Sequence, residues 1–264
     1  MRYGVNAKRG GYDFITGANG NGSEKHAFSA AGDLAARARR AALELTRNAV
    51  VNLGIGLPTA VANHFGDGKE VMLHSENGVI GMGPAPAPEQ ADYDLINAGK
   101  QPVTLLPGGC FFHHADSFAM MRGGHLDVCV LGAFQVAANG DLANWHTGAP
   151  DAIPAVGGAM DLAIGAKQTW VMMDYLTKDG RAKLVPACTY PLTGLNCVSR
   201  LYTDLAVIDL VQGLARVVEL AEGLSIIKHA NVGLHEGEVD AEKLCATEFA
   251  SMVKCIPAQF TLDR

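Results

Sequence analysis

Short apolar runs recur along the chain, and each one ends at glycine, proline or polar residues. Such runs are typical of buried strands, whereas the alanine- and leucine-rich stretches between several of them have helical spacing. The expected strands are 50–56, 70–75, 103–106, 126–134 and 168–173, and the expected helices are 33–47, 58–64, a stretch around 117–122, and 157–166. This alternation predicts an α/β fold of three layers, αβα, with a mostly parallel mixed sheet in the middle.

The two ends of the chain differ from this pattern. Residues 1–30 are rich in Gly, Asn and Ser without a period, which predicts a flexible N-terminal extension. After residue 195, the apolar runs 196–210 and 214–220 lie closer together, as strands paired at one side of the sheet would. We therefore expect a folded domain at 31–227. Residues 228–264 form a tail of uncertain structure, in which 236–254 has the composition of a polar helix.

Composition restricts the possible functions. The chain has 264 residues, 48% of them hydrophobic, which is enough to bury a sizeable core. The formal net charge of -6 offers no basic surface for nucleic acid or anionic lipid. No apolar run reaches the roughly 18 residues that a membrane-spanning helix needs, and no signal peptide is evident. The six cysteines include no CxxC pair, which fits reduced thiols. We expect a cytoplasmic protein that binds neither nucleic acid nor membranes.

The stretch SENG contains the most suggestive acidic residue. It puts Glu76 directly after an apolar run and before Asn77 and Gly78, which both tolerate a tight turn. The carboxyl ends of parallel strands form the ligand crevice of such sheets, and Gly81 and Gly83 would leave room for a ligand beside the carboxylate. From the residues alone, a glutamate that caps a helix or lies solvated in a turn is the commoner case.

Two pairs of glycines are further candidates for a site. Gly157 and Gly158 open an expected helix, whose free N–H groups could hold an oxyanion, although close packing of helix on sheet explains them equally well. Gly54 and Gly56 lie between an expected strand and an expected helix. A dinucleotide fingerprint would need its third glycine at position 59, where Thr59 stands, so NAD binding is not expected.

The sequence gives little support for a metal site or for a hydrolase motif. His113, His114 and Asp116 are metal-ligand residue types, but the side chains of adjacent histidines diverge and do not share one metal. We expect no metal site. The chain contains neither the GxSxG motif of serine hydrolases nor the GK[ST] end of a phosphate-binding loop.

Six longer segments together resemble the B subunit of the class I 3-oxoacid CoA-transferases. They are NLGIGLPT (52–59), SENGVIGMGPAP (75–86), DLINAGKQPVTLLPGG (94–109), FFHHADSFAMMRGGHLDVCVLGAFQV (111–136), GDLANW (140–145) and GGAMDL (157–162). The resemblance runs from about residue 37 to about residue 219, and within the family it is strongest for subunits that act on 3-oxoadipate. The fold it implies is that of the CoA-transferases, which is similar to the NagB and RpiA folds.

The resemblance implies a reaction and a nucleophile. SENG is the family's signature for its nucleophilic glutamate, which corresponds to Glu76. The family transfers CoA, typically from succinyl-CoA, to a 3-oxoacid through a covalent glutamyl-CoA thioester in a ping-pong sequence. CoA thioesters are its substrates, so no other cofactor is expected. We expect a partner as well, the A subunit of the CoA-transferase, in a hetero-oligomer of composition A2B2 with its active site between the two kinds of subunit.

By the same resemblance, Asn77 and Gly78 belong to the oxyanion and substrate-binding region, together with the amides of Gly157 and Gly158. The loop that contains Gly54 and Gly56 is expected to bind CoA or substrate.

The identity of the acid remains open at this stage. The B subunit of an acetoacetate or acetate CoA-transferase keeps the same chemistry, and a non-catalytic protein that binds acyl-CoA as a sensor is an alternative from another class. If the acid is 3-oxoadipate, a cation must meet its second carboxylate, and Arg122 or Arg200 could supply it.

Overall fold

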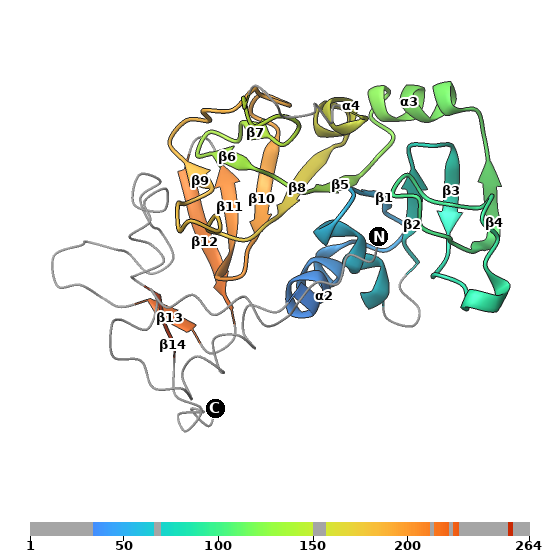
Figure 1. The fold of residues 1–264 in the computed structure, drawn as a ribbon, viewed down its shortest axis with the longest axis horizontal. Helices are drawn as coiled ribbons and strands as arrows, with labels where there is room; N and C mark the ends of the chain where they lie inside the picture. Colours follow the sequence, from blue (N-terminus) through green and yellow to red (C-terminus); the bar gives the residue numbers. More distant parts are fainter. Residues whose placement is uncertain are drawn as a thin grey trace, which may run out of the picture.

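The computed structural model describes residues 34–65, 70–149, 157–211, 214–221, 224–226 and 253–255 (Figure 1). The expected N-terminal extension at 1–30 lies outside the described residues. So does most of the expected polar helix at 236–254, of which only the last residues are described, as part of a strand.

A mixed sheet of nine strands forms the centre of the described part of the chain, in the order β12-β11-β10-β8-β5-β1-β2-β3-β4 (Figure 1). The five parallel central strands are β10 (Val198–Tyr202), β8 (Gln168–Met172), β5 (Val128–Leu131), β1 (Val50–Leu53) and β2 (Met72–Ser75). The antiparallel strands are β11 (Ala206–Val211) and β12 (Leu214–Leu220) at one edge, and β3 (Val79–Met82) and β4 (Leu105–Phe111) at the other. The predicted α/β fold with a mixed sheet is confirmed.

Side chains of the central strands alternate between two buried cores. On β5, Val128 and Val130 belong to one core, whereas Cys129 and Leu131 belong to the other, as the period of two in a strand requires. Helices cover both faces and complete the three layers. The first face carries α2 (Leu34–Glu44) and the 3-10 helix η2 (Leu57–His64), and the second carries α3 (His114–Arg122) and α4 (Ala159–Gly165).

Smaller elements complete the described structure. A three-stranded sheet contains β7 (Leu142–Ala143), β6 (Gln135–Ala137) and β9 (Leu184–Val185), in that order. A two-stranded sheet pairs β13 (Leu224–Ile226) with β14 (Val253–Cys255), and η3 (Pro88–Gln90) is a short 3-10 turn. Strands of two or three residues carry too few positions for a recognisable period, which is why the sequence did not predict them.

Two expected elements differ from the structure, and one strand was not expected. The segment Leu57–His64 forms a 3-10 helix rather than an α-helix, and at eight residues it is longer than most 3-10 helices. The strand expected at 103–106 begins at Leu105 and continues to Phe111. Strand β3 was not among the expected strands. Among the described residues, no helix is long and apolar enough to cross a membrane.

Candidate active site

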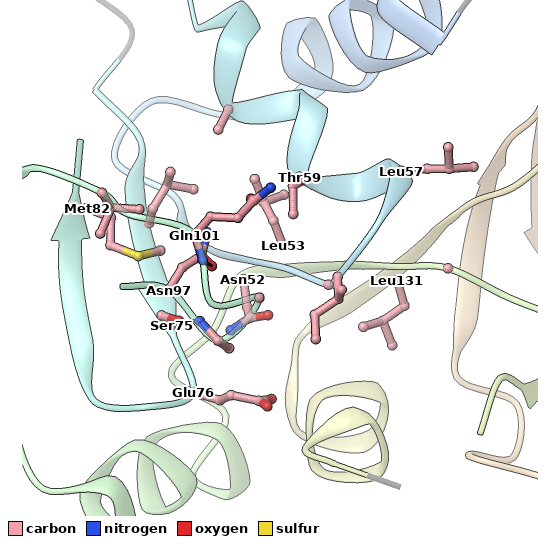
Figure 2. A pocket seen from close by; sticks show the side chains of 18 of the residues that line it. Asn52, Leu53, Leu57, Thr59, Ser75, Glu76, Met82, Asn97, Gln101 and Leu131 are labelled. Carbon is pink, nitrogen blue, oxygen red and sulfur yellow. Dashed lines mark hydrogen bonds between the residues drawn. The ribbon is translucent and has the colours of Figure 1, made fainter. Parts of the chain in front are cut away.

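A pocket of about 1040 Å³ lies at the carboxyl ends of β1, β2, β5 and β8 (Figure 2). This is where ligands bind in sheets with a parallel centre, because the loops after neighbouring parallel strands converge there. Leu53, Glu76, Leu131 and Met173 mark the four strand ends that reach it. The long connection between β3 and β4 supplies another wall, with proline and alanine side chains that make much of the lining apolar.

Glu76 is the carboxylate of this pocket. It follows the last residue of β2 and is half-buried, and Figure 2 shows its side chain extending toward helix α4. Burial raises the pKa of the Glu76 carboxyl, because the anion loses water. The charge of His114 and a hydrogen bond from the backbone of Gly158 act in the opposite direction, and the charge of Asp161 raises the pKa further. The carboxylate is thus partly desolvated while specific groups still favour its anion.

Gly158 leaves the space that the carboxylate occupies. A Cβ atom at this position would collide with Oε2 of Glu76 and would lie 2.9 Å from its Cδ. The preceding Gly157 has φ of +45° and open space where a Cβ would lie, and both glycines line the pocket. The sequence prediction that these glycines lie near Glu76 agrees with this geometry, although about 80 residues separate the two segments along the chain.

The turn after Glu76 depends on Gly78. Its φ is +103°, a conformation that side chains rarely adopt, and a Cβ there would collide with the carbonyl oxygen of Phe112. Its N–H donates to the carbonyl of Ser75 at 3.0 Å, and its own carbonyl accepts from the N–H of Phe112 at 3.0 Å. Asn77 is exposed and donates through Nδ2 to the carbonyl of Ile96 at 2.8 Å. Neither Asn77 nor Gly78 lines the pocket, so here they shape the turn and hold the neighbouring loop.

A buried polar network lies behind the turn, and sequence reasoning missed it. Asn52 donates through Nδ2 to Nδ1 of His74 at 3.1 Å and to the His74 carbonyl at 3.2 Å. On the other side of the ring, Nε2 of His74 lies 2.9 Å from Oγ of Ser117. Since Nδ1 accepts, Nε2 carries the proton. Burial lowers the pKa of His74 to about 4, so its ring is neutral near pH 7. The network joins β1, β2 and α3 next to Glu76, and Asn52 and His74 also line the pocket.

The remaining glycines of the sequence analysis have different placements. Gly54 lines the pocket, and its N–H donates to the Val130 carbonyl at 2.8 Å, whereas Gly56 is outside the lining. Gly81 was expected to leave room beside the carboxylate. It instead permits β3 to approach β4, because a Cβ there would lie 2.6 Å from Cα of Gly109.

The candidate cations and metal ligands lie mostly elsewhere. Arg122 pairs with Asp161 at 2.6 Å near the exposed end of α3. Arg200, on β10, pairs with Glu44 at 3.0 Å. Neither arginine lines the pocket. His113 caps the start of α3 by accepting from the N–H of Ala115. Among the residues that the structure describes, no three His, Cys, Asp or Glu side chains gather as metal ligands would.

Comparisons with known proteins identify related sequences. The family model "Coenzyme A transferase" matches residues 35–227. The B subunit of 3-oxoadipate CoA-transferase from Pseudomonas putida is 69% identical over 183 residues, which are 69% of this chain and 85% of that protein. The subunit of the same name in Acinetobacter baylyi is 63% identical, with 71% of this chain and 87% of that protein covered. The B subunit of succinyl-CoA:3-ketoacid coenzyme A transferase from Helicobacter pylori is 49% identical, with 71% and 90% covered.

Solved structures share the fold at much lower identity. An acyl-CoA transferase from Escherichia coli O157:H7 aligns with a TM-score of 0.58 and 19% identity, covering 85% of this chain and 46% of that one. Glutaconate coenzyme A-transferase from Acidaminococcus fermentans aligns with a TM-score of 0.52 and 16% identity, covering 70% and 77%. At this level of identity the likeness establishes the fold alone.

Proposed function

This chain belongs to the coenzyme A transferase family, and on that premise we propose that it is the B subunit of an enzyme that moves CoA from succinyl-CoA to 3-oxoadipate. The 69% identity to the 3-oxoadipate subunit of Pseudomonas putida supports this acceptor over the acid of the 3-ketoacid transferases, whose Helicobacter pylori subunit is 49% identical. Glu76 is the proposed nucleophile.

The proposed reaction passes through two covalent intermediates on Glu76. An oxygen of Glu76 attacks the thioester carbonyl of the donor, the C–S bond breaks, CoA leaves as a thiolate, and the acyl group forms a mixed anhydride with Glu76. The thiolate attacks the glutamyl carbonyl carbon, the donor acid leaves as a carboxylate, and a glutamyl-CoA thioester remains. The acceptor carboxylate then reverses both steps. Charge and electrons balance at each step without a redox group, so the proposal requires no prosthetic group.

The observation that carries this proposal is the placement of the Glu76 carboxylate on the wall of the large pocket, against the backbone of Gly158. Partial burial removes water from the carboxylate, which increases its nucleophilicity and protects an anhydride from hydrolysis. His114 and the Gly158 backbone still favour the anion that must attack.

Each attack also creates a tetrahedral oxyanion, which needs hydrogen-bond donors. We assign part of that role to the backbone amides of Gly157 and Gly158, since both line the pocket next to the carboxylate and neither carries a side chain that would block approach. We assign the rest to the A subunit.

The proposed assembly joins this chain to an A subunit, because the relatives are named as B subunits. We propose two copies of each subunit in the complex. Purified alone, the chain is expected to be inactive, and activity should return when the A subunit is added. Light scattering of the active complex should give a mass of two A and two B subunits. Full turnover by this chain alone would contradict the shared site.

The test of the nucleophile is covalent labelling of the complete enzyme. Incubation with succinyl-CoA, followed by borohydride or hydroxylamine, should modify the peptide that contains Glu76. The Glu76→Ala variant should lose both the label and CoA transfer, whereas Glu89→Ala, a change at an exposed glutamate beside the pocket wall, should retain both. A label on another peptide would reject the assignment.

Acceptor acids test the second half of the proposal. After labelling by succinyl-CoA, transfer to 3-oxoadipate should exceed transfer to acetoacetate or acetate. The opposite order would favour an acetoacetate or acetate transferase with the same nucleophile. Reversible binding of acyl-CoA without any adduct would favour a non-catalytic sensor.

A further inference from the structure

The proposed acceptor and the proposed donor share a feature that the pocket must accommodate, which is a second carboxylate at the far end of the acyl chain. A buried or half-buried carboxylate requires a cation or several hydrogen bonds. Arg200 is held by two carboxylates on the other side of the fold, and Arg122 lies outside the pocket. Among the described residues that line the pocket, Lys183 is the one Lys or Arg side chain.

Backbone hydrogen bonds hold Lys183 at the end of the sheet that the pocket occupies. Its N–H donates to the carbonyl of Tyr175, just after β8, at 2.9 Å, and its carbonyl accepts from the N–H of Val136 on β6 at 2.9 Å. The position of the residue is therefore fixed by two elements, while its ammonium group lies on a flexible stem.

The acidic residues near Lys183 are engaged with other donors. Asp174 pairs with Arg37 at 2.8 Å, and buried Asp204 accepts from the N–H of Tyr175 at 2.6 Å. Within the described part of the chain, no carboxylate lies within 4.0 Å of the Lys183 ammonium group, the distance that defines an ion pair. Burial lowers the pKa of Lys183, the charges of Asp174 and Asp204 act in the opposite direction, and the charge of Arg37 lowers it further. The ammonium group thus retains capacity for a carboxylate ligand.

The end of β5 leaves a path between Lys183 and the nucleophile. Strand order places β1 and β5 between β8 and β2, whose last residue precedes Glu76. Three strand spacings, roughly 14 Å, therefore separate the ends of β2 and β8. Glu76 and Lys183 both line the pocket between these strand ends. Gly132, directly after β5, lines the same pocket, and a Cβ there would meet no atom within 4 Å. A short acyl chain can therefore cross the end of β5 without displacing a side chain.

We propose that Lys183 binds the distal carboxylate of dicarboxylic substrates, and so selects succinyl and 3-oxoadipyl groups over monocarboxylic acyl groups. This specificity role rests on the proposed transfer at Glu76. Lys183 takes no part in bond breaking, and its contribution is to orient the acyl chain over Gly132 with the reacting carbonyl at Glu76.

The experiment compares acids that differ only at the far end. The complete enzyme is assayed with 3-oxoadipate and with 3-oxohexanoate, in which a methyl group replaces the distal carboxylate. Lys183→Met should lower kcat/KM for 3-oxoadipate by about 10- to 100-fold, the effect of one charge-assisted hydrogen bond, and should leave 3-oxohexanoate within about twofold. Formation of the Glu76 adduct from succinyl-CoA and from butyryl-CoA should show the same contrast.

Two controls keep the outcomes separate. Lys178→Met removes an exposed lysine five positions away, outside the pocket lining, and should leave kcat/KM unchanged for both acids. Lys183→Arg keeps the charge and should restore part of the preference. Equal losses for both acids in Lys183→Met, or no loss for either, would overturn the specificity role. If the wild-type enzyme itself shows no preference for the dicarboxylic acid, the proposed acceptor fails instead.

Discussion

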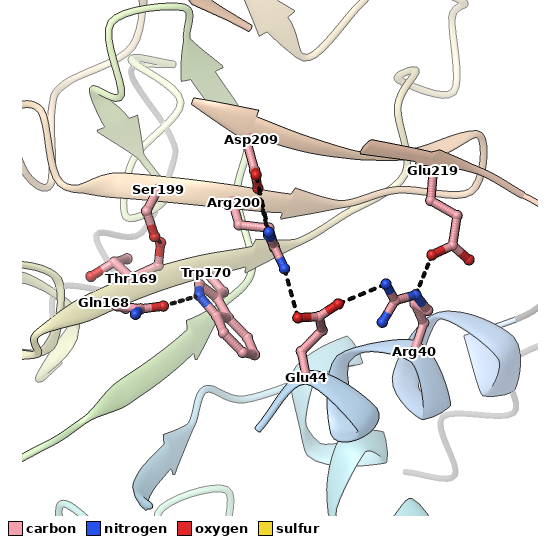
Figure 3. Close-up of polar contacts among 9 residues, drawn as sticks. All are labelled: Arg40, Glu44, Gln168, Thr169, Trp170, Ser199, Arg200, Asp209 and Glu219. Carbon is pink, nitrogen blue, oxygen red and sulfur yellow. Dashed lines mark hydrogen bonds and ion pairs between the residues drawn. The ribbon is translucent and has the colours of Figure 1, made fainter. Parts of the chain in front are cut away.

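The two ends of the nine-stranded sheet use polar residues in different ways. Next to Glu76 lies a buried network of neutral groups, which consists of Asn52, His74 and Ser117. Near the opposite edge, helix α2 is tied to β10, β11 and β12 by charged groups (Figure 3). The residues of this charged network are Arg40, Glu44, Arg200, Asp209 and Glu219.

Glu44 is the central carboxylate of the charged network. Its two oxygens lie 2.6 Å from a nitrogen of Arg40 and 3.0 Å from a nitrogen of Arg200. Arg200 also binds Asp209 through two contacts of 2.5 and 3.0 Å, and Arg40 pairs with Glu219. Burial alone would raise the pKa of Glu44, but hydrogen bonds and charges from Arg40 and Arg200 lower it overall. These side chains are partly exposed, so water and salt weaken each pair.

The contrast shows how a carboxylate can be oriented by neutral groups rather than by an ion pair. An ion in direct contact with Glu76 would add to the opposing effects of His114 and Asp161 and would shift its pKa further. Neutral hydrogen bonds orient the backbone before Glu76 and add no such charge. At the far edge no group has to react, and ion pairs can join helix to sheet there without affecting the chemistry.

The largest expected effect of a single change concerns Gly78 in the turn. Gly78→Ala places a side chain at φ of +103° and against the backbone carbonyl of Phe112, so the free energy of unfolding should fall by about 3 to 5 kcal/mol. Gly108→Ala is the matched control, since its φ is +88° but nothing lies within 4 Å of a Cβ. That variant should lose only about 1 to 2 kcal/mol. Equal losses in urea denaturation would mean that the contact with Phe112 does not matter.

Gly158→Ala should separate catalysis from stability. The new methyl group would meet the far end of a flexible side chain, so Glu76 can move away at little cost in stability. Displacing a nucleophile by about 1 Å costs on the order of 100-fold in rate. We therefore expect kcat to fall about 100-fold while the melting temperature stays near that of the wild type. Gly148→Ala, in the connection that leads toward α4, has open space but φ of +78°, so it should lose about 1 to 2 kcal/mol of stability and retain kcat. A Gly158→Ala variant with normal kcat would show that the carboxylate needs no such room.

His74 tests the neutral network. His74→Leu leaves the amide of Asn52 and the hydroxyl of Ser117 without their buried partner, which should cost about 1 to 3 kcal/mol of stability and lower kcat. His74→Gln can accept from Asn52 and donate to Ser117, so it should restore kcat while KM stays unchanged. If Leu and Gln behave alike in kcat, the network does not position Glu76.

The pH dependence of stability gives a second measurement on His74. Its folded pKa of about 4 lies below the unfolded value of about 6.5, so the unfolded chain binds a proton first as pH falls. The stabilisation is fully present above about pH 6.5 and is lost as pH falls toward about 4. Between about pH 7 and about pH 5 the loss should be about 2 kcal/mol. His74→Gln lacks this contribution, so the difference between its urea denaturation series and the wild-type series should show the change. Parallel series would mean that His74 titrates normally.

The sequence predicted the strand and the turn around Glu76 better than it predicted the side-chain contacts of the site. The apolar run before Glu76 and the glycines after it were local signals, and both the strand end and the turn are present. Strand β3 was missed because Gly81 resembles a loop residue, although it serves the close approach of two strands.

Long-range contacts left no local signal in the sequence. Asn52, His74 and Ser117 come from three separate elements, and nothing in the spacing of a histidine within an apolar run indicates which partners tertiary packing brings to it. Lys183 likewise reaches the pocket only because β8 and the small sheet place it there. The motif could therefore indicate the proposed nucleophile, but not the groups that we propose position it or select its substrate.

The smallest effect is expected in the charged network. Glu44→Gln keeps the shape of the side chain but removes the charge between Arg40 and Arg200, and partly exposed pairs of this kind contribute about 1 kcal/mol or less. Because the pKa of Glu44 is lowered in the folded state, its contribution is present above the ordinary carboxyl range and is lost as pH falls through it.

At neutral pH the Glu44→Gln variant should therefore be slightly less stable than the wild type, and about 1 M NaCl should narrow the difference, since the Debye length then falls to about 3 Å. Its kcat should be unchanged, because no member of this network lines the pocket. Glu70→Gln breaks a largely exposed pair with Arg47 and should have no measurable effect. If Glu44→Gln instead lowered kcat as His74→Leu is expected to, the ion pairs at the far edge would also position the active site. The proposed difference in role between the neutral network and the charged network would then be wrong.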